Sequence, residues 1–308
     1  MCDADDVARC AIDHFNAQKL KDYGLKDGEW TILSAILSHS PDSGLTVLSM
    51  ACGTKSVPAK LVDDYSIHDG HAEVLCRRGL VHLMASDDAP DLTGHTLHMF
   101  VSAPPCGDCA IFDLDTPHLG FNDYRTGSKP VVGALLDRTG VGLFRTKPGR
   151  GERSPSMSCS DKLVRWAYLG LLGKRGPPLF LDTLTVGLPA DTTALERSFG
   201  RLSRLDMRRH GPYRVHPPEL RTSPVEFPLA RTEARRPSPH CYWAAGTAHE
   251  VIVGKLGLPR GVSLRDREKR PSALSRAALG LGPGPAAGYE AAALEYKLAV
   301  EDYNRGAV

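Results

Sequence analysis

The sequence predicts an α/β fold in which helices pack on a central sheet. Apolar, strand-like segments alternate along the chain with segments whose apolar residues recur at helical spacing. With 308 residues, the chain can bury a sizeable core as one large domain or two small ones. Hydrophobic residues make up 42% and charged residues 24%, as in an ordinary globular protein. No apolar run approaches the ~18–20 residues that a membrane span requires.

The first hundred residues predict two helices and three strands. Residues 3–20 place apolar side chains at helical spacing after aspartates that can cap a helix. Residues 29–39 and 44–55 are two strand segments, and the turn-forming sequence "SPDSG" separates them. Residues 71–86 are amphipathic and predict a helix, whereas residues 95–103 predict a strand that leads into "PPCGDC".

The rest of the chain continues this alternation but contains two stretches without a periodic pattern. The expected elements are a short strand at 140–145, a helix at 158–173, a strand at 178–188, a helix at 191–208, a strand at 249–257 and a helix at 288–304. Residues 113–130 are rich in Pro, Gly and Asp and predict a loop. Residues 209–240 are rich in Pro and Arg and predict a long surface loop or insertion.

The formal net charge of +2 conceals an asymmetry along the chain. Residues 1–100 hold 8 Lys and Arg against 15 Asp and Glu, whereas residues 101–308 hold 30 against 21. Of the 38 basic residues 26 are Arg, whose planar fork suits phosphate. The surplus indicates a polyanionic partner for the second part of the chain. A biased composition that fills solvated faces with Arg explains the counts equally well.

Cysteine usage and the N-terminal sequence indicate in which cellular compartment the protein is expected. Eight cysteines are scattered without a framework pattern, which favours a reducing, intracellular location and makes the thiols candidates for metal binding or catalysis. The opening "MCDADDVARC" is acidic and lacks the apolar core of a signal peptide. We therefore expect the protein in the nucleus, the cytoplasm or both.

One pair of motifs, His-x-Glu and Pro-Cys-x-x-Cys, indicates a specific chemistry. His71-Ala72-Glu73 opens a predicted helix, and Pro105-Cys106 follows a predicted strand with Cys109 three residues further on. The pattern H-x-E…P-C-x-x-C is typical of zinc-dependent nucleobase deaminases. A neutral imidazole and two thiolates hold zinc and leave a position open, and the metal lowers the pKa of a water molecule. Glu73 would stand beside that water without binding the metal and would move its protons.

Each piece of this pattern alone has a more ordinary explanation. His-x-Glu at a helix start is more often a cap than a catalyst, and Cys-x-x-Cys can be a structural zinc site or a redox pair. The order of the motifs, the change from strand to helix and the proline before Cys106 favour the deaminase interpretation. The residue that supplies the second sulfur ligand is not decided at this point, because Cys159 at the start of the 158–173 helix is an alternative to Cys109.

The segments "HAEVLCRR", "PCGD" and "SCSDKLVRW", in this order, resemble the adenosine deaminases that act on RNA. The tRNA-specific branch fits best, because "KPGRGERSPSMSCSDK", "EWTILSAIL", "ACGTK" and "LEYKLAVEDY" are similar to its flanking segments. The resemblance extends from about residue 24 to 304. It implies a single editase domain over residues 1–308. The implied fold is a cytidine-deaminase-like three-layer domain, whose central mixed sheet is flanked by helices and extended by C-terminal helices.

The resemblance also implies the roles of individual residues at the metal. The zinc ligands would be His71, Cys106 and Cys159, with Glu73 as the proton shuttle, and Cys109 would be a spectator near the metal. A ligand pair of Cys106 and Cys109, as in cytidine deaminases, remains the rival assignment.

A buried inositol hexakisphosphate is a second cofactor that the resemblance implies. The matching positions are Arg77, Arg78, Lys162, Arg165, Trp166, Arg276, Lys297 and Tyr303. Asp69 and Lys162 match the relay that connects this anion to a zinc-bound cysteine. Three departures speak against it: His68 replaces the usual Asn, Ala293 replaces an expected Tyr, and the chain stops at Val308, where relatives continue with a segment that closes the pocket. Without the resemblance, these basic residues would be assigned to solvated helix faces.

For RNA, the resemblance and the charge pattern indicate two further sets of contacts. Thr54 and Lys55 match a loop that contacts the target nucleotide, whereas Lys147, Arg150 and Arg153 precede Cys159 in a basic loop suited to phosphate contacts.

The implied activity is the hydrolytic deamination of adenosine to inosine in tRNA, at the adenosine 3′ of the anticodon in tRNA for alanine. The partner would be tRNA, and we expect no membrane and no obligate protein partner. Two alternatives remain: another zinc deaminase acting on cytidine, wobble adenosine or a free nucleoside, and a non-catalytic RNA-binding subunit with structural zinc.

Overall fold

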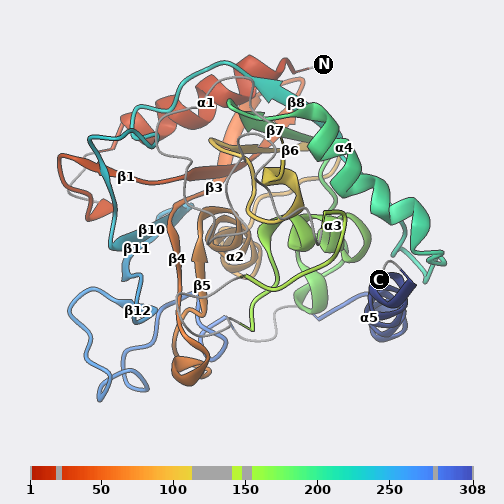
Figure 1. Ribbon diagram of the computed structural model, residues 1–308. Coiled ribbons are helices and arrows are strands. Elements are labelled where there is room, and N and C mark those ends of the chain that lie inside the picture. Colours follow the sequence, from red (N-terminus) through yellow and green to blue (C-terminus); the bar gives the residue numbers. More distant parts are fainter. Residues whose placement is uncertain (1, 19–22, 113–140, 148–154, 280–283, 307–308) are drawn as a thin grey trace.

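The computed structural model describes residues 2–18, 23–112, 141–147, 155–279 and 284–306, and a mixed eight-stranded sheet forms its centre (Figure 1). In spatial order the strands are β12 (Leu258–Pro259), β11 (Ala248–Val253), β10 (His240–Ala245), β3 (Gly44–Cys52), β2 (Leu33–Ser40), β6 (Thr96–Val101), β7 (Thr183–Gly187) and β8 (Glu219–Ser223). The strands from β12 to β6 pair antiparallel, whereas β6, β7 and β8 are parallel.

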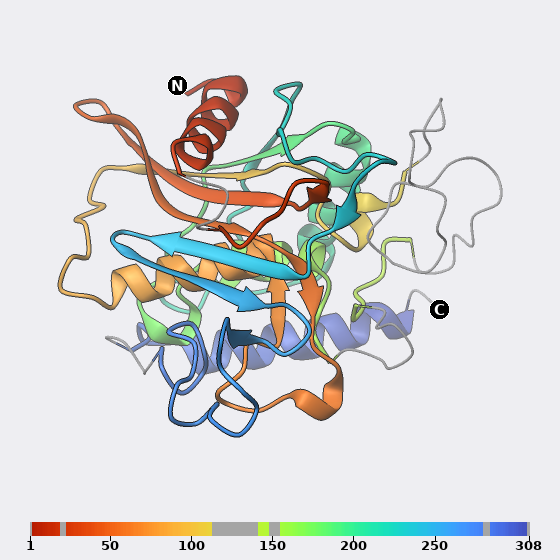
Figure 2. The same ribbon diagram turned by 90° about the vertical axis from the view of Figure 1, so that its left-hand side faces the viewer.

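Helices cover both faces of this sheet. The helix α1 (Ala4–Asn16) lies on one face and α2 (Ala72–Met84) on the other, with α5 (Tyr289–Gly306) further out on the α2 side (Figure 2). The helix α3 (Cys159–Leu169) shares the α2 side, and α4 (Thr192–Gly200) packs against β8 and α3. These layers confirm the predicted α/β fold with a central mixed sheet flanked by helices.

The alternation of side chains along β2 explains why both faces need cover. Leu33, Ala35 and Leu37 pack into the core beneath α1, whereas Ile36 packs into the core beneath α2 and α3. All four side chains are fully buried. The strand is thus buried on both faces, and the small side chains of Ser34 and Ser38 are buried with its apolar residues.

The two site-bearing helices begin at polar residues. The Ser158 side chain accepts a hydrogen bond from the backbone N–H of Asp161 and so caps α3. His71 occupies the same position before α2 but makes no capping hydrogen bond. Its imidazole is therefore available for other contacts.

Two predicted strands divide where the chain leaves the large sheet. Residues 29–39 become β1 (Glu29–Trp30), which pairs with β9 (Arg236–Pro237), followed by β2. Residues 44–55 divide at Gly53, after which β4 (Thr54–Ser56) pairs with β5 (Asp69–His71). A Cβ on Gly53 would lie 2.0 Å from the carbonyl oxygen of Gly70, so only glycine allows this approach.

The structure corrects three expectations for the second half of the chain. Residues 209–240 are not a surface loop throughout, because β8 lies at the sheet edge and Tyr213 and Phe227 are buried. The expected strand at 140–145 is absent from the described residues 141–145, where the chain turns and continues without strand pairing. The central strand β10 was not predicted.

Two further expectations concern a loop and the possibility of a membrane span. The loop expected at 113–130 lies outside the described residues. In the described part of the chain, no helix combines the length and apolar character that a membrane span needs.

Candidate metal centre and active site

Three side chains that are far apart in the sequence converge beside the start of α2. His71 ends β5, Cys106 lies in the loop after β6, and Cys159 is the first residue of α3. The His71 Nδ1 atom is 3.6 Å from the sulfur of each cysteine, and the three ligand atoms lie within 4.8 Å of one another. These separations suit atoms about 2.0–2.3 Å from a common zinc ion in tetrahedral geometry. The sulfur-rich donor set therefore fits zinc.

Burial keeps this cluster away from bulk water and couples the two thiols. Cys106 is 6% exposed and Cys159 is fully buried. A hydrogen bond from Cys159, together with the nearby charges of Lys147 and His71, holds the pKa of Cys106 well below its usual range despite burial. These contacts favour the thiolate form of Cys106, the form that binds metal.

Cys109 lies outside this cluster. It is fully buried in the core beneath α2 and α3, and burial raises the pKa of its thiol to about 11. Its backbone N–H donates to the Ser160 hydroxyl at 3.0 Å. The structure thus brings together His71, Cys106 and Cys159 and does not form the alternative pair of Cys106 and Cys109.

Glu73 is the acidic side chain of the first turn of α2. It is 2% exposed, and its Oε2 atom has no hydrogen-bond partner among the described residues. Burial raises the pKa of this carboxyl, and the nearby Cys106 adds to the effect while His71 opposes it. A buried carboxylate oxygen without a partner costs free energy unless a ligand or water completes its hydrogen bonds. The position suits a group that exchanges protons with a bound substrate.

Asp69 lies two residues before His71 and joins the buried Lys147 to the half-buried Lys162. The Lys147 ammonium donates to both carboxylate oxygens of Asp69 at 2.7 Å, and the Lys162 ammonium also donates to this carboxylate. Ser156 donates a further hydrogen bond at 2.7 Å. Burial alone would raise the pKa of Asp69, but the two lysines outweigh it and hold the pKa well below its usual range.

This network corrects the role expected for Lys147. We expected a surface contact to RNA, but the side chain is 4% exposed and its charge is held by Asp69. The nearby Cys106 and Cys159 also favour its charged form. Arg150 and Arg153, expected in the same role, lie outside the described residues. Asp69 and Lys162 are in direct contact, as expected for the relay.

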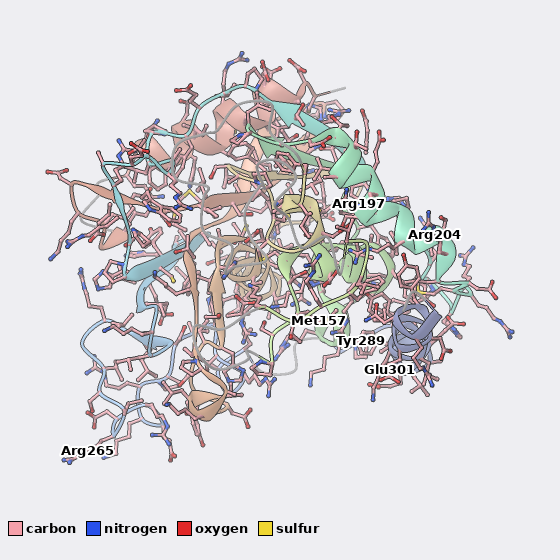
Figure 3. The ribbon with its side chains drawn as sticks, in the orientation of Figure 1. Met157, Arg197, Arg204, Arg265, Tyr289 and Glu301 are labelled. Atoms are coloured by element: carbon pink, nitrogen blue, oxygen red, sulfur yellow. The ribbon has the colours of Figure 1, made fainter. Side chains whose placement is uncertain are left out.

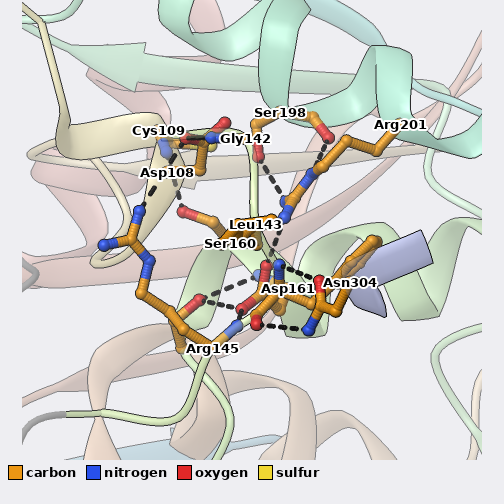
Figure 4. Close-up of polar contacts among 12 residues, drawn as sticks. Asp108, Cys109, Gly142, Leu143, Arg145, Ser160, Asp161, Ser198, Arg201 and Asn304 are labelled. Atoms are coloured by element: carbon orange, nitrogen blue, oxygen red, sulfur yellow. Dashed lines mark hydrogen bonds and ion pairs between the residues drawn. The ribbon is translucent and has the colours of Figure 1, made fainter. Parts of the chain in front are cut away.

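Two arginines of α4 and the turn after it hold the cysteine-bearing segments together. Arg201 donates from Nη1 to Asp161, two residues after Cys159, at 2.8 Å, and Arg201 is 1% exposed (Figure 4). Arg197 donates to the Asp108 carboxylate at 3.1 Å and to the Asp108 carbonyl at 2.8 Å, two residues after Cys106. Because the arginines are four residues apart, one helical face fixes both loops.

The hydroxyl of Ser160 ties the same two segments directly. It accepts from the Cys109 N–H (Figure 4). It also donates toward the carbonyl oxygens of Pro105 and Cys106 at 3.1 and 3.0 Å. Sequence reasoning missed Arg197, Arg201 and Ser160. The only available signal was the spacing of the two arginines on one helical face.

A second cluster, of arginines, lies on the outer side of α2 and α3. The Arg77 guanidinium lies 5.3 Å over the Trp166 ring, and its Nε atom is buried without a hydrogen-bond partner among the residues that the structure describes. Burial, reinforced by Arg78, Arg165 and Arg175, lowers the pKa of Arg77 to about 9. Burial likewise lowers the pKa of Arg78 to about 10, and its Nε atom donates to a backbone carbonyl. The cluster is therefore an electropositive region that an anion would stabilise.

Three other residues that were expected at the anion site differ in their exposure and contacts. Arg276 is 59% exposed beside Asp64, and Lys297 is 71% exposed beside Glu301 on α5, so neither lies in a buried pocket. The Tyr303 ring packs on Phe144, with ring centroids 5.6 Å apart.

Thr54 and Lys55 lie on β4 beside the metal-binding strand. They pair with His71 and Gly70 in the short sheet formed with β5, and both side chains are half-buried. The structure thus places this expected substrate loop next to the metal cluster.

Comparison with known proteins identifies the family. The sequence model of the adenosine-deaminase (editase) domain matches residues 92–281, a range that includes Cys106 and Cys159. The chain is 30% identical to tRNA-specific adenosine deaminase 1 of Drosophila melanogaster over 250 residues, covering 69% of this chain and 63% of that protein.

Two mammalian proteins are also similar. The chain is 32% identical to human tRNA-specific adenosine deaminase 1 over 165 residues, covering 46% of this chain and 33% of that protein. It is 26% identical to the mouse double-stranded RNA-specific editase B2, covering 67% of this chain and 33% of that protein. The chain thus spans between one third and 63% of the length of these relatives. Because the domain model covers more than half of the chain, the protein belongs to the adenosine-deaminase (editase) domain family.

Proposed function

We propose that this protein hydrolyses the exocyclic amine of adenosine in tRNA and so produces inosine. The observation that carries the proposal is the buried Glu73 carboxylate, whose Oε2 atom has no partner in the described chain, at the start of the helix that follows His71. A purely structural metal site has no use for such a carboxylate. The similarity to tRNA-specific adenosine deaminase 1 of the fly and of humans supports the choice of tRNA.

His71, Cys106 and Cys159 would hold zinc in this site. Among the described residues no fourth His, Cys, Asp or Glu joins the group, as is usual for a catalytic site that keeps one position open. When bound, zinc would make a water molecule acidic enough to react near neutral pH.

The chain's own residues would then guide the reaction. Glu73 would take a proton from the attacking water and pass it to the adenine ring, and it would carry a second proton to the departing amine. The water oxygen replaces the nitrogen at C6, the C6–N bond breaks, and ammonia leaves. Thr54 and Lys55 would contact the target nucleotide from β4, next to His71.

Within tRNA, we infer that the substrate is the adenosine 3′ of the anticodon of tRNA for alanine. A base in a loop can be turned into a pocket at little cost compared with a base in a duplex. This inference rests on the resemblance of the motif-flanking segments to the tRNA-specific branch of the family.

We also propose that the arginine cluster binds inositol hexakisphosphate. Arg77, Arg78 and Arg165 carry like charges close together, and burial of such charges requires a compensating anion. Trp166 and Lys162 border the same part of α3. Mass spectrometry of an acid extract tests this cofactor: the expected result is about one inositol hexakisphosphate per chain, and a clean absence rejects it.

The function itself is tested by incubating the protein with tRNA transcripts and mapping inosine. We expect inosine at one anticodon-loop adenosine and none in a transcript with guanosine there. Conversion of cytidine, of the wobble adenosine or of free nucleosides instead would favour another zinc deaminase. Binding of tRNA without any conversion would favour a non-catalytic RNA-binding subunit.

A further inference from the structure

Residues 255–276, here named the basic arm, concentrate positive charge on the surface. The arm follows β11 and carries seven Lys and Arg residues against two acidic residues, a net charge of +5. The basic residues are Lys255, Arg260, Arg265, Arg267, Lys269, Arg270 and Arg276. Figure 3 shows Arg265 projecting from one extremity of the molecule.

Most of these charges make no ion pair with the described residues. Arg267 pairs with Asp63 at 2.9 Å, and Arg276 lies 3.6 Å from Asp64. The other five are exposed and make no ion pair within the part of the chain that the structure describes: Lys255, Arg260, Arg265, Lys269 and Arg270. An ordinary solvated face usually interleaves both signs so that such cations find neighbours, whereas this surface keeps an uncompensated surplus.

The basic arm is fixed beside the elements that carry the metal site. It is hydrogen-bonded to the connection between β4 and β5 through Ile67 N–H to the Gly257 carbonyl at 2.7 Å and Ala277 N–H to the Asp64 carbonyl at 2.9 Å. The ion pair of Arg267 with Asp63 adds a third attachment. This connection ends in the strand that carries His71, and both views show the arm beside it (Figures 1 and 2).

The arm also continues the surface of the expected substrate loop. Gly254, at its base, lies against Lys55, because a Cβ at Gly254 would be 2.8 and 2.7 Å from Cβ and Cγ of that lysine. Lys55 and the arm therefore belong to one basic surface that adjoins the strand carrying His71.

We propose that the basic arm binds the phosphate backbone of the RNA substrate, outside the pocket that receives the reacting base. The inference rests on the proposed function for the choice of RNA. Exposed Arg and Lys side chains on a fixed support suit phosphate oxygens, which position a nucleic acid without reading its sequence. The arm would thus supply affinity and orientation, while the metal centre supplies the chemistry.

The test compares two double variants that remove the same charge. Arg265→Ser with Arg270→Ser removes two unpaired arginines of the arm, and the turn should persist because Arg270 N–H donates to the Asp266 carbonyl through the backbone. The control, Arg9→Ser with Arg305→Ser, removes two exposed arginines that neighbour Asp6 and Asp302 elsewhere. Affinity for a tRNA transcript is measured by filter binding over a salt series.

For the arm variant we expect Kd to rise about tenfold at about 0.1 M salt, with the slope of log Kd against log salt reduced by about 1 to 2. The control should keep the affinity and slope of the unaltered protein within about twofold. Equal behaviour of the two double variants overturns the inference.

Inosine formation by the unaltered protein is measured in parallel to separate the two proposals. If the unaltered protein forms inosine and the arm variant binds tRNA normally, the arm proposal fails alone. If the unaltered protein forms no inosine but the arm variant loses affinity and slope, the proposed function fails alone.

Discussion

Two charged regions lie on the same side of the sheet, and they are built in opposite ways. Around the cysteines the buried acidic groups other than Glu73 have partners of opposite sign: Asp69 holds two lysines, and Asp161 and Asp108 hold Arg201 and Arg197. On the outer side of α2 and α3, Arg77, Arg78 and Arg165 make no ion pair within the described residues.

We interpret the paired region as a structural scaffold and the unpaired region as a proposed binding site. Removing one partner from a buried pair leaves an uncompensated charge. Substitutions in the paired region should therefore destabilise the fold. Like charges held together without a counter-charge weaken the fold, and a bound anion would offset this, so the unpaired region is the one that we propose to bind an anion.

The largest effect is expected at Glu73, a carboxylate with one oxygen that has no hydrogen-bond partner among the described residues. Glu73→Gln keeps the volume but removes the proton carrier, so inosine formation should fall by about 10²–10⁴-fold. Metal content and tRNA affinity should stay as in the unaltered protein. Single-turnover assays with an exposed control, Glu290→Gln, measure the loss; a variant that keeps its activity would refute the assigned role.

In the paired region, Arg201→Met should be strongly destabilising. It leaves the Asp161 carboxylate buried without its cation, at a cost of about 3–5 kcal/mol in the free energy of unfolding. Urea unfolding measures the change, and Arg201→Lys serves as a milder variant if the methionine variant does not fold. The exposed Arg204 gives the control, since Arg204→Met should change stability by less than about 0.5 kcal/mol. Equal effects at both positions would contradict a scaffold role.

In the unpaired region, an arginine-to-methionine substitution should have the opposite effect on stability. Arg77→Met relieves repulsion from Arg78 and Arg165, so it should stabilise protein stripped of inositol phosphates by about 1 kcal/mol. Addition of inositol hexakisphosphate should then raise the melting temperature of the unaltered protein more than that of the variant. A loss of stability as large as that of Arg201→Met would remove the distinction between the regions.

The smallest effect is expected for Asp63, a partly exposed carboxylate at the base of the basic arm. Burial opposes its ionisation, but hydrogen bonds from Ser66 and Tyr65 and the charge of Arg267 lower its pKa. A lowered folded-state pKa contributes stability above the unfolded value of about 3.9 and loses it as pH falls further. Asp63→Asn should therefore cost less than about 1 kcal/mol at pH 7. This difference should disappear below about pH 3, and a cost that persists there would exclude an ionic origin.

The sequence predicted the elements that carry the site better than it predicted the contacts between them. The segments 71–86 and 158–173 show helical periodicity because one face of each meets the core, and the structure has α2 and α3 there. The motif spacing pointed to His71, Cys106 and Cys109, and Cys159 was considered because it starts a predicted helix. The choice of Cys159 over Cys109 came from the family resemblance.

The contacts that could not be predicted from the sequence join residues that are far apart along the chain. Lys147 appears in a basic loop, which suggests a surface position, but its partner Asp69 is 78 residues away. Arg201 likewise finds Asp161 at a separation of 40 residues. The edge strand β8 pairs on one side only and is half-exposed, so "ELRTS" lacks an apolar pattern. No local signal distinguishes such residues from solvated ones.

Zinc content after single cysteine substitutions tests the central arrangement most directly. Cys159→Ala and Cys109→Ala are purified in parallel, and bound zinc is measured by atomic emission together with circular dichroism to verify the fold. We predict about one zinc per chain in the unaltered protein and in Cys109→Ala, and a nearly complete loss in Cys159→Ala. Loss of zinc from folded Cys109→Ala, with retention in Cys159→Ala, would contradict the metal centre described above.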